Sequence, residues 1–448
     1  MIISPIDYRY GRDEVKKIFS EEARLSYMLK VEGAIAEAEG ELGIIPKKDA
    51  KNIAKYANTK FVDIKEVKKL EKQIGHDVMA MVKVLAEVSG QSGAFVHLGA
   101  TSNDINDTAT ALQLKDFYYI LEEDLFRLGK SLSTLAYKYK KTPMMGRTHG
   151  QHALPITFGL KMSVYLNEIM RHIERVRESR KRVIVGKFMG AVGTGAALGE
   201  KTIEIQEIVM RKLEIGYEEG PTQLVDRDRY VEYVSILSSI ATSLEKFSTE
   251  VRNLQRPEID EVQEPFDEDK QVGSSTMAQK VNPVVSENIS SLARIIRGFL
   301  NPMHESSILW HERDLTNSAS ERFIIPYTSV LIDDILNKMS NVFEGLKVNE
   351  KKMLENLLND ELVLGEAYIM NLVRLGYGRQ EAHEIVREAS MKSRKTGMKL
   401  KDLIEEKTGK RLDDINPLDY TGNSIAITEK ILKRFERLNG RKKVKPNQ

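Results

Sequence analysis

The sequence predicts an all-α protein built around a central bundle of long helices, and three observations support this fold class. Apolar residues recur at spacings of three and four over most of the 448 residues. Several of these stretches exceed the usual length of a globular helix, which favours long helices packed side by side. Only residues 183–188, with the glycines that follow, show the pattern of a short strand or hairpin.

The expected helices follow one another from the N-terminus. The first apolar stripe begins at Leu25 and stops at Gly43, a residue type that often ends a helix. A much longer stripe covers residues 112–135, and Pro155, which suits a first helical turn, predicts the start of the next helix. The remaining long helices are expected at residues 229–254, 284–300 and 321–343.

This order of helices suggests three helical domains, because a chain of 448 residues is too long for a single hydrophobic core. The N-terminal domain is expected to cover residues 1–99. The central long-helix domain, which holds a conspicuous polar loop, covers residues 100–345. A smaller C-terminal domain covers residues 346–448.

Composition and charge narrow the class of protein. Hydrophobic residues make up 41% and charged residues 30%, as in an ordinary globular protein. The net charge of +2 gives no reason to expect a nucleic acid or a membrane surface as partner. The sequence has no cysteine, which excludes disulfides and thiolate metal sites. The opening MIISPIDYRYGRDEVKK has no apolar signal core, and no run spans a bilayer, so a cytoplasmic location is expected.

Two motifs look functional but do not fit their chemistry. Residues 193–202 (GTGAALGEKT) look like a phosphate loop, but Glu200 separates the Gly and Lys that such a loop needs in succession. His149 and His152 could share a helix face and hold a metal, but no third ligand stands nearby, so no metal is expected. His149 in its Gly-flanked loop is then either a structural or a functional histidine, and the residues alone leave both open.

Two polar segments interrupt the apolar pattern early in the chain. Residues 75–77 (GHD) open one helix. Thr101 and Ser102 stand just before another, with Asp104 and Asp107 in its first turns. One interpretation is a helix N-cap with acidic residues near the positive end of the helix. The other is a seat for a carboxylate or phosphate, built from hydroxyls and free backbone amides.

The polar loop at residues 273–283 (GSSTMAQKVNP) is out of place between long amphipathic helices. Lys280 and Asn282 could hold an anion that gains charge during a reaction. Ser274 and Ser275 offer a hydroxyl that could move a proton if its pKa is lowered. The alternative is a surface loop, where Ser, Gly and Lys are common.

Taken together, these segments resemble one family. The loop is similar to the Gly-Ser-Ser-x-Met-Pro-x-Lys-x-Asn-Pro motif of the fumarase/aspartase superfamily. Further segments resemble the adenylosuccinate lyase family in the same order along the chain: SPIDYRYGRDEVKKIFSEEARL, GHDVMAM, VHLGATSNDINDTA, GRTHGQHALPITFG, TQLVDRDRY and WHERDLTNSASER. The resemblance implies an all-α homotetramer with a central bundle of long helices. It also implies active sites that are each assembled from three subunits.

The chemistry that this resemblance implies is β-elimination of fumarate in purine synthesis. Members of the family split adenylosuccinate to AMP, and succinylaminoimidazole carboxamide ribotide (SAICAR) to AICAR. The reaction removes a proton next to a carboxylate, stabilises the doubly negative intermediate and protonates the leaving nitrogen. A base, an acid and an anion clamp are therefore needed, without a metal or redox cofactor.

The resemblance also assigns catalytic roles. Ser274 matches the catalytic base, and His149 matches the general acid. Lys280 and Asn282 match the groups that hold the fumaryl carboxylates, and Glu287 would orient or balance the charge of the site. His76 is expected as a further catalytic histidine. The substrate-binding residues implied by the resemblance are Arg9, Tyr10, Gly75, His76, Asp77, His97, Thr101, Ser102, Gln223, Ser275, Lys280, Asn282, Arg313, Ser318 and Arg322.

The sequence departs from the family pattern at two positions. Ala278 replaces the usual proline of the loop, which should raise the entropy cost of ordering it. Gly75 stands where the family often carries an arginine, so one anion contact would be missing or supplied elsewhere. Two rival functions are another lyase or cycloisomerase of the superfamily, and an inactive helical scaffold on the same fold. The nucleotide-facing segments argue against the first, and the presence of Ser274, His149 and Lys280 argues against the second.

Overall fold

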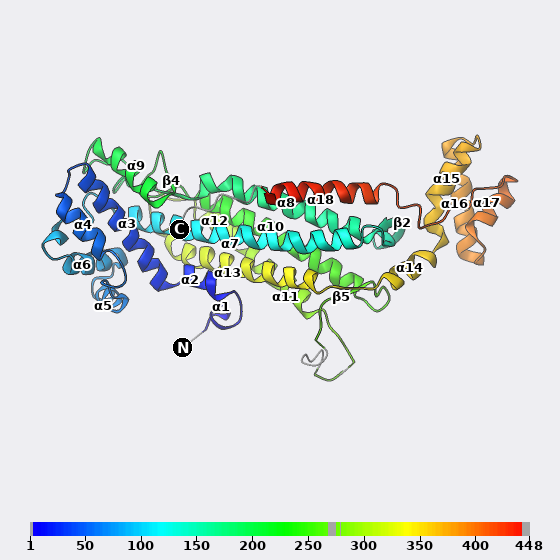
Figure 1. Cartoon of the computed structure of the whole chain (residues 1–448), viewed down its shortest axis with the longest axis horizontal. Coiled ribbons are helices and arrows are strands. Elements are labelled where there is room, and N and C mark those ends of the chain that lie inside the picture. The colour runs from blue at the N-terminus through cyan, green and yellow to red at the C-terminus, as the bar shows by residue number, and fades with distance from the viewer. Residues whose placement is uncertain (1–2, 268–274, 278, 441–448) are drawn as a thin grey trace. The chain divides into compact units, whose positions relative to one another are not determined.

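The computed structural model describes residues 3–267, 275–277 and 279–440, and it confirms the predicted all-α fold (Figure 1). The described chain forms two compact units, and each unit is made of several stretches. Unit 1 comprises Met1–Leu125, His172–Leu244 and Ser291–Asn337, and unit 2 comprises Phe126–Arg171, Glu245–Ser290 and Lys338–Gln448. The division into three domains stays a prediction.

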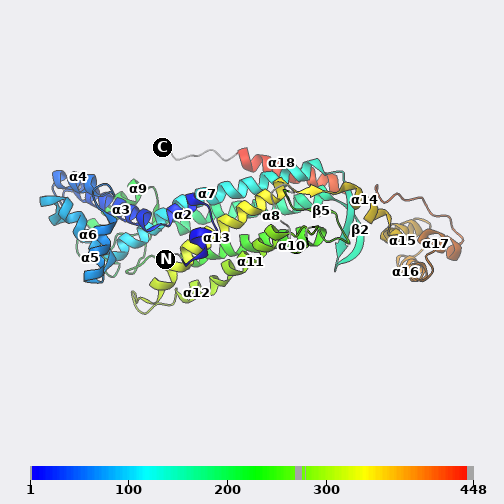
Figure 2. The same cartoon turned by 90° about the horizontal axis from the view of Figure 1, so that it is seen from below.

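Long helices are present, as the sequence periodicity predicts, and each contributes residues to both units. They are α7 (Ser102–Lys138), α8 (Phe158–Val183), α10 (Asp228–Leu254), α11 (Val284–Gly298) and α13 (Thr316–Glu344). Within unit 1, the parts of α7, α8, α10 and α13 that belong to it run side by side in two perpendicular views (Figures 1 and 2). None of the helices in the described ranges is long and apolar enough to cross a membrane.

Unit 1 begins with short and medium helices that precede the bundle. Its other elements are α1 (Pro5–Tyr8), α2 (Asp13–Ile18), α3 (Glu21–Glu41), α4 (Lys47–Tyr56), α5 (Ile64–Ile74), α6 (Asp77–Val88), η1 (Gly90–Phe95), β3 (Val185–Gly186), α9 (Lys201–Leu213), β4 (Gly216–Tyr217) and α12 (Leu300–Glu305). The side chain of Ser20 caps α3 by accepting the N–H of Ala23 at 3.2 Å. Helices α3 to α6 and α9 gather around one apolar core that includes Leu29, Ile53 and Met81 (Figure 1).

Unit 2 holds a hairpin, two short strands and the C-terminal helices. Its elements are β1 (Pro143–Thr148), β2 (Gln151–Thr157), β5 (Val262–Gln263), β6 (Lys347–Val348), α14 (Glu350–Leu358), η2 (Glu361–Leu364), α15 (Gly365–Arg374), α16 (Arg379–Thr396), α17 (Leu400–Thr408) and α18 (Ser424–Gly440). Helices α15 to α17 form a cluster (Figure 1), with a core that includes Leu372, Val386 and Ile404.

The structure corrects one helix start and refines two other expectations. Pro155 does not open a helix: it lies in β2 opposite Met145, and α8 begins at Phe158. The register shifts just beyond Met145, and a strand irregularity is a place where proline is tolerated. The strand expected at residues 183–188 is the two-residue β3, which pairs in parallel with β4 rather than in a hairpin. The helix expected at residues 284–300 is divided into α11 and α12.

Candidate active site

A cavity of about 360 Å³ in unit 1 brings several predicted binding residues together. Its wall includes Asp77, Arg313, Ser318 and Arg322, which come from α6, the segment before α13, and α13 itself. Pro326 of α13 also lines it and cannot supply the N–H that the carbonyl of Arg322 would accept in a regular helix. A cavity of this size lies within the range of small-molecule sites.

The turn between α5 and α6 places the predicted GHD residues at the N-terminus of α6. Gly75 ends α5 in a left-handed conformation with φ of 70°, a backbone conformation that glycine adopts more readily than other residues. His76 caps α6, because its Nδ1 accepts the N–H of Met79 at 3.2 Å. Its Nε2 lies 3.4 Å from the hydroxyl of Ser102, and Asp77 lies 3.4 Å from Arg322. These contacts join three predicted segments that are far apart in the sequence.

The start of α7 is held by Asp104. Its carboxylate accepts the backbone N–H of Thr101 at 2.8 Å, as expected for an acidic residue in the first turn. It also accepts the N–H groups of Met189 at 3.0 Å and Gly190 at 3.1 Å, and it pairs with the buried ammonium of Lys187. The acidic first turn expected at this helix is therefore present, with Asp104 accepting from Thr101, and a cap by the hydroxyl of Thr101 or Ser102 stays a prediction. Whether Thr101 and Ser102 also seat a carboxylate stays a prediction.

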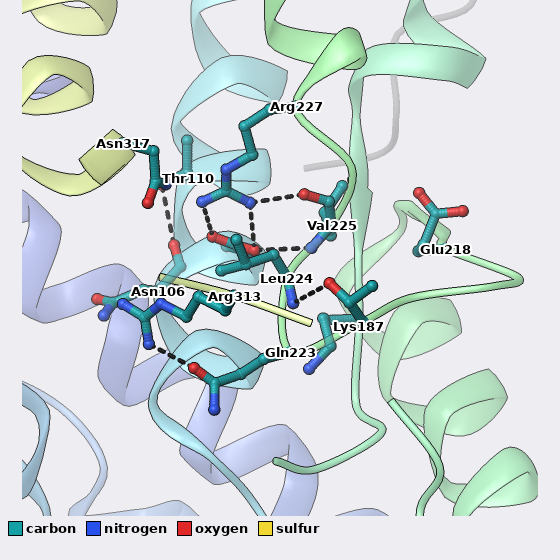
Figure 3. A network of polar contacts seen from close by, with 12 residues as sticks. Asn106, Thr110, Lys187, Glu218, Gln223, Leu224, Val225, Arg227, Arg313 and Asn317 are labelled. Carbon is teal, nitrogen blue, oxygen red and sulfur yellow. Dashed lines mark hydrogen bonds and ion pairs between the residues drawn. The ribbon is translucent and has the colours of Figure 1, made fainter. Parts of the chain in front are cut away.

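Arg313, which lines the cavity, contacts Gln223, which does not. Arg313 donates from Nη1 to the Gln223 side-chain oxygen at 2.6 Å, and the two side chains point toward each other in Figure 3. Gln223 in turn donates to the carbonyl of Ala191 at 2.9 Å. When the Asn103 amide is oriented with its oxygen toward Arg313, that oxygen accepts from Nη1 at 2.9 Å and from Nε at 3.3 Å. The two side chains that accept from this guanidinium are thus neutral amides.

A buried ion-pair network lies beside these residues (Figure 3). Arg227 donates to Asp107 at 2.7 and 2.9 Å and to Glu321 at 2.9 and 3.2 Å, and it is 6% exposed. Asn317 donates to Glu321 at 2.8 Å. Burial opposes the charge of Arg227, but Asp107 and Glu321 outweigh it and hold its pKa well above the ordinary value. The network ties α7 to the start of α13, which positions the wall of the cavity.

The segment that carries Arg9 and Tyr10 is anchored to α13 by its neighbours. Gly11, in a left-handed conformation with φ of 81°, donates its N–H to Asp334 at 3.0 Å. Arg12 donates from its backbone to Asp333 at 3.1 Å and from Nε to the same carboxylate at 2.9 Å. Arg9, Tyr10 and His97, although described, lie outside the cavity wall. The structure therefore fixes this segment without bringing it to the cavity.

His97 has a well-defined structural partner. Its Nδ1 lies 2.6 Å from a carboxylate oxygen of Glu32, which is 1% exposed, and its backbone φ is 64°. Burial disfavours the charged ring, but the hydrogen bond and charge of Glu32 outweigh burial and raise the pKa of His97. The ion pair explains why this histidine is held in place, and a role in substrate binding stays a prediction.

In unit 2, His149 lies at the tip of the β1–β2 hairpin. His149 and Gly150 have φ values of 54° and 74°, the positive values that a two-residue type I′ turn requires. The hairpin is anchored by Arg147, which donates to the buried carboxylate of Glu261 at 3.0 and 2.7 Å. The imidazole of His149 is exposed in the chain. His152, which accompanied it in the rejected metal interpretation, lies 2.8 Å from Asp360.

The described part of the polar loop leads into α11. Ser275, Lys280 and Glu287 are exposed, and Asn282 is half-buried. The expected base Ser274 lies outside the described residues, as do Gly273 and Ala278.

A buried carboxylate holds the start of α11. Glu264 is 2% exposed and accepts the N–H groups of Val285 and Ser286, both at 3.0 Å. It also accepts the hydroxyl of Ser286 at 2.9 Å. Glu264 thereby caps the helix whose first turn carries Glu287.

Sequence reasoning missed several residues at the cavity. Asn103, Asn106, Asp107 and Thr110 occupy one polar face of α7 at spacings of three and four, and all line the cavity. That spacing inside an apolar helix was a usable signal. The lining residues Arg24 and Glu321 show no such spacing, although both lie in segments that resemble the family, SPIDYRYGRDEVKKIFSEEARL and WHERDLTNSASER.

Comparisons with known proteins identify the relatives of this chain. The family described as "Lyase" matches residues 7–298, and the family described as "Adenylosuccinate lyase C-terminus" matches residues 361–431. An adenylosuccinate lyase of Pyrococcus abyssi is 44% identical over 98% of this chain and 100% of the relative. One of Pyrococcus horikoshii is 45% identical over the same shares, and one of Methanocaldococcus jannaschii is 43% identical over 97% and 96%.

Solved structures agree with this grouping at the level of the fold and superfamily. A fumarate lyase from Mesorhizobium sp. BNC1 has a TM-score of 0.86 and 31% identity, over 94% of this chain and 98% of that one. A 3-carboxy-cis,cis-muconate lactonizing enzyme from Pseudomonas putida has a TM-score of 0.86 and 30% identity, over 97% and 99%.

Proposed function

Because the chain belongs to the adenylosuccinate lyase family of the fumarase/aspartase superfamily, we propose that it splits adenylosuccinate into AMP and fumarate. We propose the same elimination for SAICAR, which yields AICAR. The chain is a carbon–nitrogen lyase of purine biosynthesis. The observation that carries this conclusion is full-length identity of 42–45% to several adenylosuccinate lyases, together with the match of the family-specific C-terminus.

The reaction needs three groups, and the chain offers a candidate for each. We propose Ser274 as the base that removes the proton next to the carboxylate, and His149 as the acid that protonates the leaving nitrogen. Lys280 and Asn282 would hold the fumaryl carboxylates as negative charge develops, with Glu287 orienting the site. The support for these roles is the loop motif for Ser274 and the exposed hairpin tip for His149.

The nucleotide half of the substrate is assigned to residues that surround or border the cavity of unit 1. Arg313, Ser318 and Arg322 line it, and Gln223 contacts Arg313. Guanidinium groups suit a phosphate because they present paired donors. The neighbouring part of the substrate would be bound by His76, Asp77, Thr101 and Ser102. The binding site would be completed by Gly75, His97 and Ser275. Arg9 and Tyr10 are proposed to reach the nucleotide from their anchored segment.

We propose that the chain assembles as a homotetramer whose active sites combine residues of different subunits. Large apolar side chains support self-association, because Ile308, Trp310, Leu315 and Phe323 are 70%, 76%, 67% and 59% exposed within one stretch. Mixing two inactive variants, S274A and H149Q, would test shared sites: recovered activity in the mixture supports them, and none argues against them. A cytoplasmic location also stays a proposal.

Fumarate release from adenylosuccinate and from argininosuccinate, in separate assays, tests the proposed reaction. We expect equal amounts of fumarate and AMP from adenylosuccinate and no release from argininosuccinate. Release from argininosuccinate alone would show that the nucleotide-facing residues had been misassigned. If a folded, assembled protein released no fumarate from either substrate, the remaining functions would be an inactive scaffold or a lyase for another substrate of the superfamily.

A further inference from the structure

We propose that Arg24, held in position by Asn106, is an additional binding residue for the phosphate monoester of the nucleotide. This inference rests on the proposed function, since it names a residue of the same cavity and the part of the substrate that it recognises. Nothing in the resemblance assigns a role to Arg24, which lies in the first turn of α3. Its side chain lines the same cavity as Arg313, Ser318 and Arg322.

Most of the cations around this cavity already have a carboxylate partner. Lys68 pairs with Glu21 near the surface. Arg322 lies 3.4 Å from Asp77. Arg227 is enclosed by two carboxylates, as described above, and its charge is more than balanced. The charges of Lys68 and Arg227 are therefore already balanced, whereas the charge of the exposed Arg322 is only partly balanced by Asp77.

Arg24 and Arg313 are different, because the side chains that accept from them are neutral amides. Arg24 donates from Nη2 to the side-chain oxygen of Asn106 at 2.8 Å, and Arg313 donates to Gln223. Among the described residues, neither has a carboxylate within the 4.0 Å of an ion pair. An amide orients a guanidinium without neutralising it, so both keep their positive charge available to a ligand.

The electrostatics of the cavity favour an anion at Arg24. Burial lowers the pKa of Arg24, and the charges that face it are Asp77 and Asp107, which favour its charge, and Arg322, which opposes it. Asp107 is engaged by Arg227, and Asp77 by Arg322. A half-buried guanidinium with neutral partners gains from a dianion, because the attraction is strong where water is excluded.

The geometry of α7 explains how Arg24 is aimed. Asn103 and Asn106 are three residues apart on one face of the helix, so their amides stand next to each other. Asn103 faces Arg313 and Asn106 faces Arg24. Two neighbouring amides thus hold two guanidinium groups at one cavity, an arrangement that suits the several oxygens of a phosphate better than a single carboxylate. Asn106 is therefore a positioning residue.

Calorimetric binding of AMP and of adenosine to the full-length protein tests the proposal, because the two ligands differ only in the phosphate. In R24M we expect AMP affinity to fall by about 10- to 100-fold and adenosine affinity to stay unchanged. The matched control is K68M, which removes a cation of the same cavity that already has a partner, and it should change neither affinity. Equal loss for both ligands, or an unchanged AMP affinity, would overturn the proposal.

Two further variants keep the test informative. R24K retains the charge but loses the fork, so it should give an intermediate loss of AMP affinity if R24M does not fold. N106L should weaken AMP binding in the presence of Arg24 and add little in R24M, whereas additive losses would contradict a positioning role. A wild type that binds AMP through Arg24 but releases no fumarate from adenylosuccinate would refute the proposed reaction and leave this inference standing.

Discussion

Glu39 should make the stability of unit 1 depend on pH. Its side chain lies in α3 and is fully buried, and both carboxylate oxygens lack a hydrogen-bond partner among the described residues. Burial raises the pKa of Glu39 to about 8, and the nearby charge of Glu32 adds to the effect. The folded protein therefore keeps a proton on Glu39 at neutral pH, whereas the unfolded chain releases it at its ordinary pKa of 4.5.

The size and sign of the effect follow from this difference. The pKa rises from 4.5 to about 8, a difference of about 3.5, and each unit is worth about 1.36 kcal/mol. The contribution of protonated Glu39 to the free energy of unfolding is fully present below pH 4.5 and is lost as the pH rises through the folded pKa of about 8. In E39Q this group no longer titrates, so the stability of E39Q relative to the wild type should grow by about 3.5 kcal/mol between pH 5 and pH 8.

Hydrogen exchange of the α3 backbone amides measures this stability locally, at matched pH values for the wild type and E39Q. The matched control is E37Q, on the same helix, whose carboxylate is exposed and lies 3.0 Å from Lys212. An exposed pair contributes little, so E37Q should differ from the wild type by less than about 1 kcal/mol at every pH. A difference between E39Q and the wild type that does not change with pH would refute the reasoning.

Three other predictions concern contacts that position the site. The substitution D333N removes the carboxylate that holds Arg12 and should loosen the Arg9–Tyr10 segment. The KM for adenylosuccinate should then rise about tenfold, with kcat less affected. An unchanged KM would contradict the anchoring role. K187M should lower the free energy of unfolding by about 3–5 kcal/mol, measured as a lower thermal midpoint, because it leaves Asp104 buried without its cation. Adding D104L to K187M should recover part of this loss. A K187M variant as stable as the wild type would be inconsistent with a buried ion pair. E264Q should weaken the cap of α11 by about 1–2 kcal/mol, seen as faster hydrogen exchange in its first turn; exchange at the wild-type rate would argue against the cap.

The sequence predicted the helices well because helix periodicity is a local property. The stripe at residues 112–135 lies within α7, and the one at residues 229–254 lies within α10. The hairpin was missed because proline is acceptable both in a first helical turn and at a strand irregularity, so Pro155 did not discriminate. The turn at the tip of the hairpin needs a positive φ at His149, and a histidine in the sequence does not predict that conformation.

The candidate site was predicted only where motifs marked it. Asp77, Arg313, Ser318 and Arg322 belong to recognisable segments, and the fold brings all four to one cavity. Other contacts join residues whose separation no local pattern spans. Arg227 and Asp107 are 120 residues apart, and Arg24 and Asn106 are 82 residues apart. Such pairs depend on how helices pack, which periodicity alone does not determine.

The most direct test of the proposed reaction is fumarate release from adenylosuccinate by the wild type beside S274A and H149Q. Circular dichroism and thermal midpoints would first establish that both variants fold. We expect equal release of fumarate and AMP by the wild type, and a loss of at least about a thousandfold in each variant, because each variant lacks a group that moves a proton. A folded variant that kept more than about a tenth of the wild-type rate would contradict the role given to that residue.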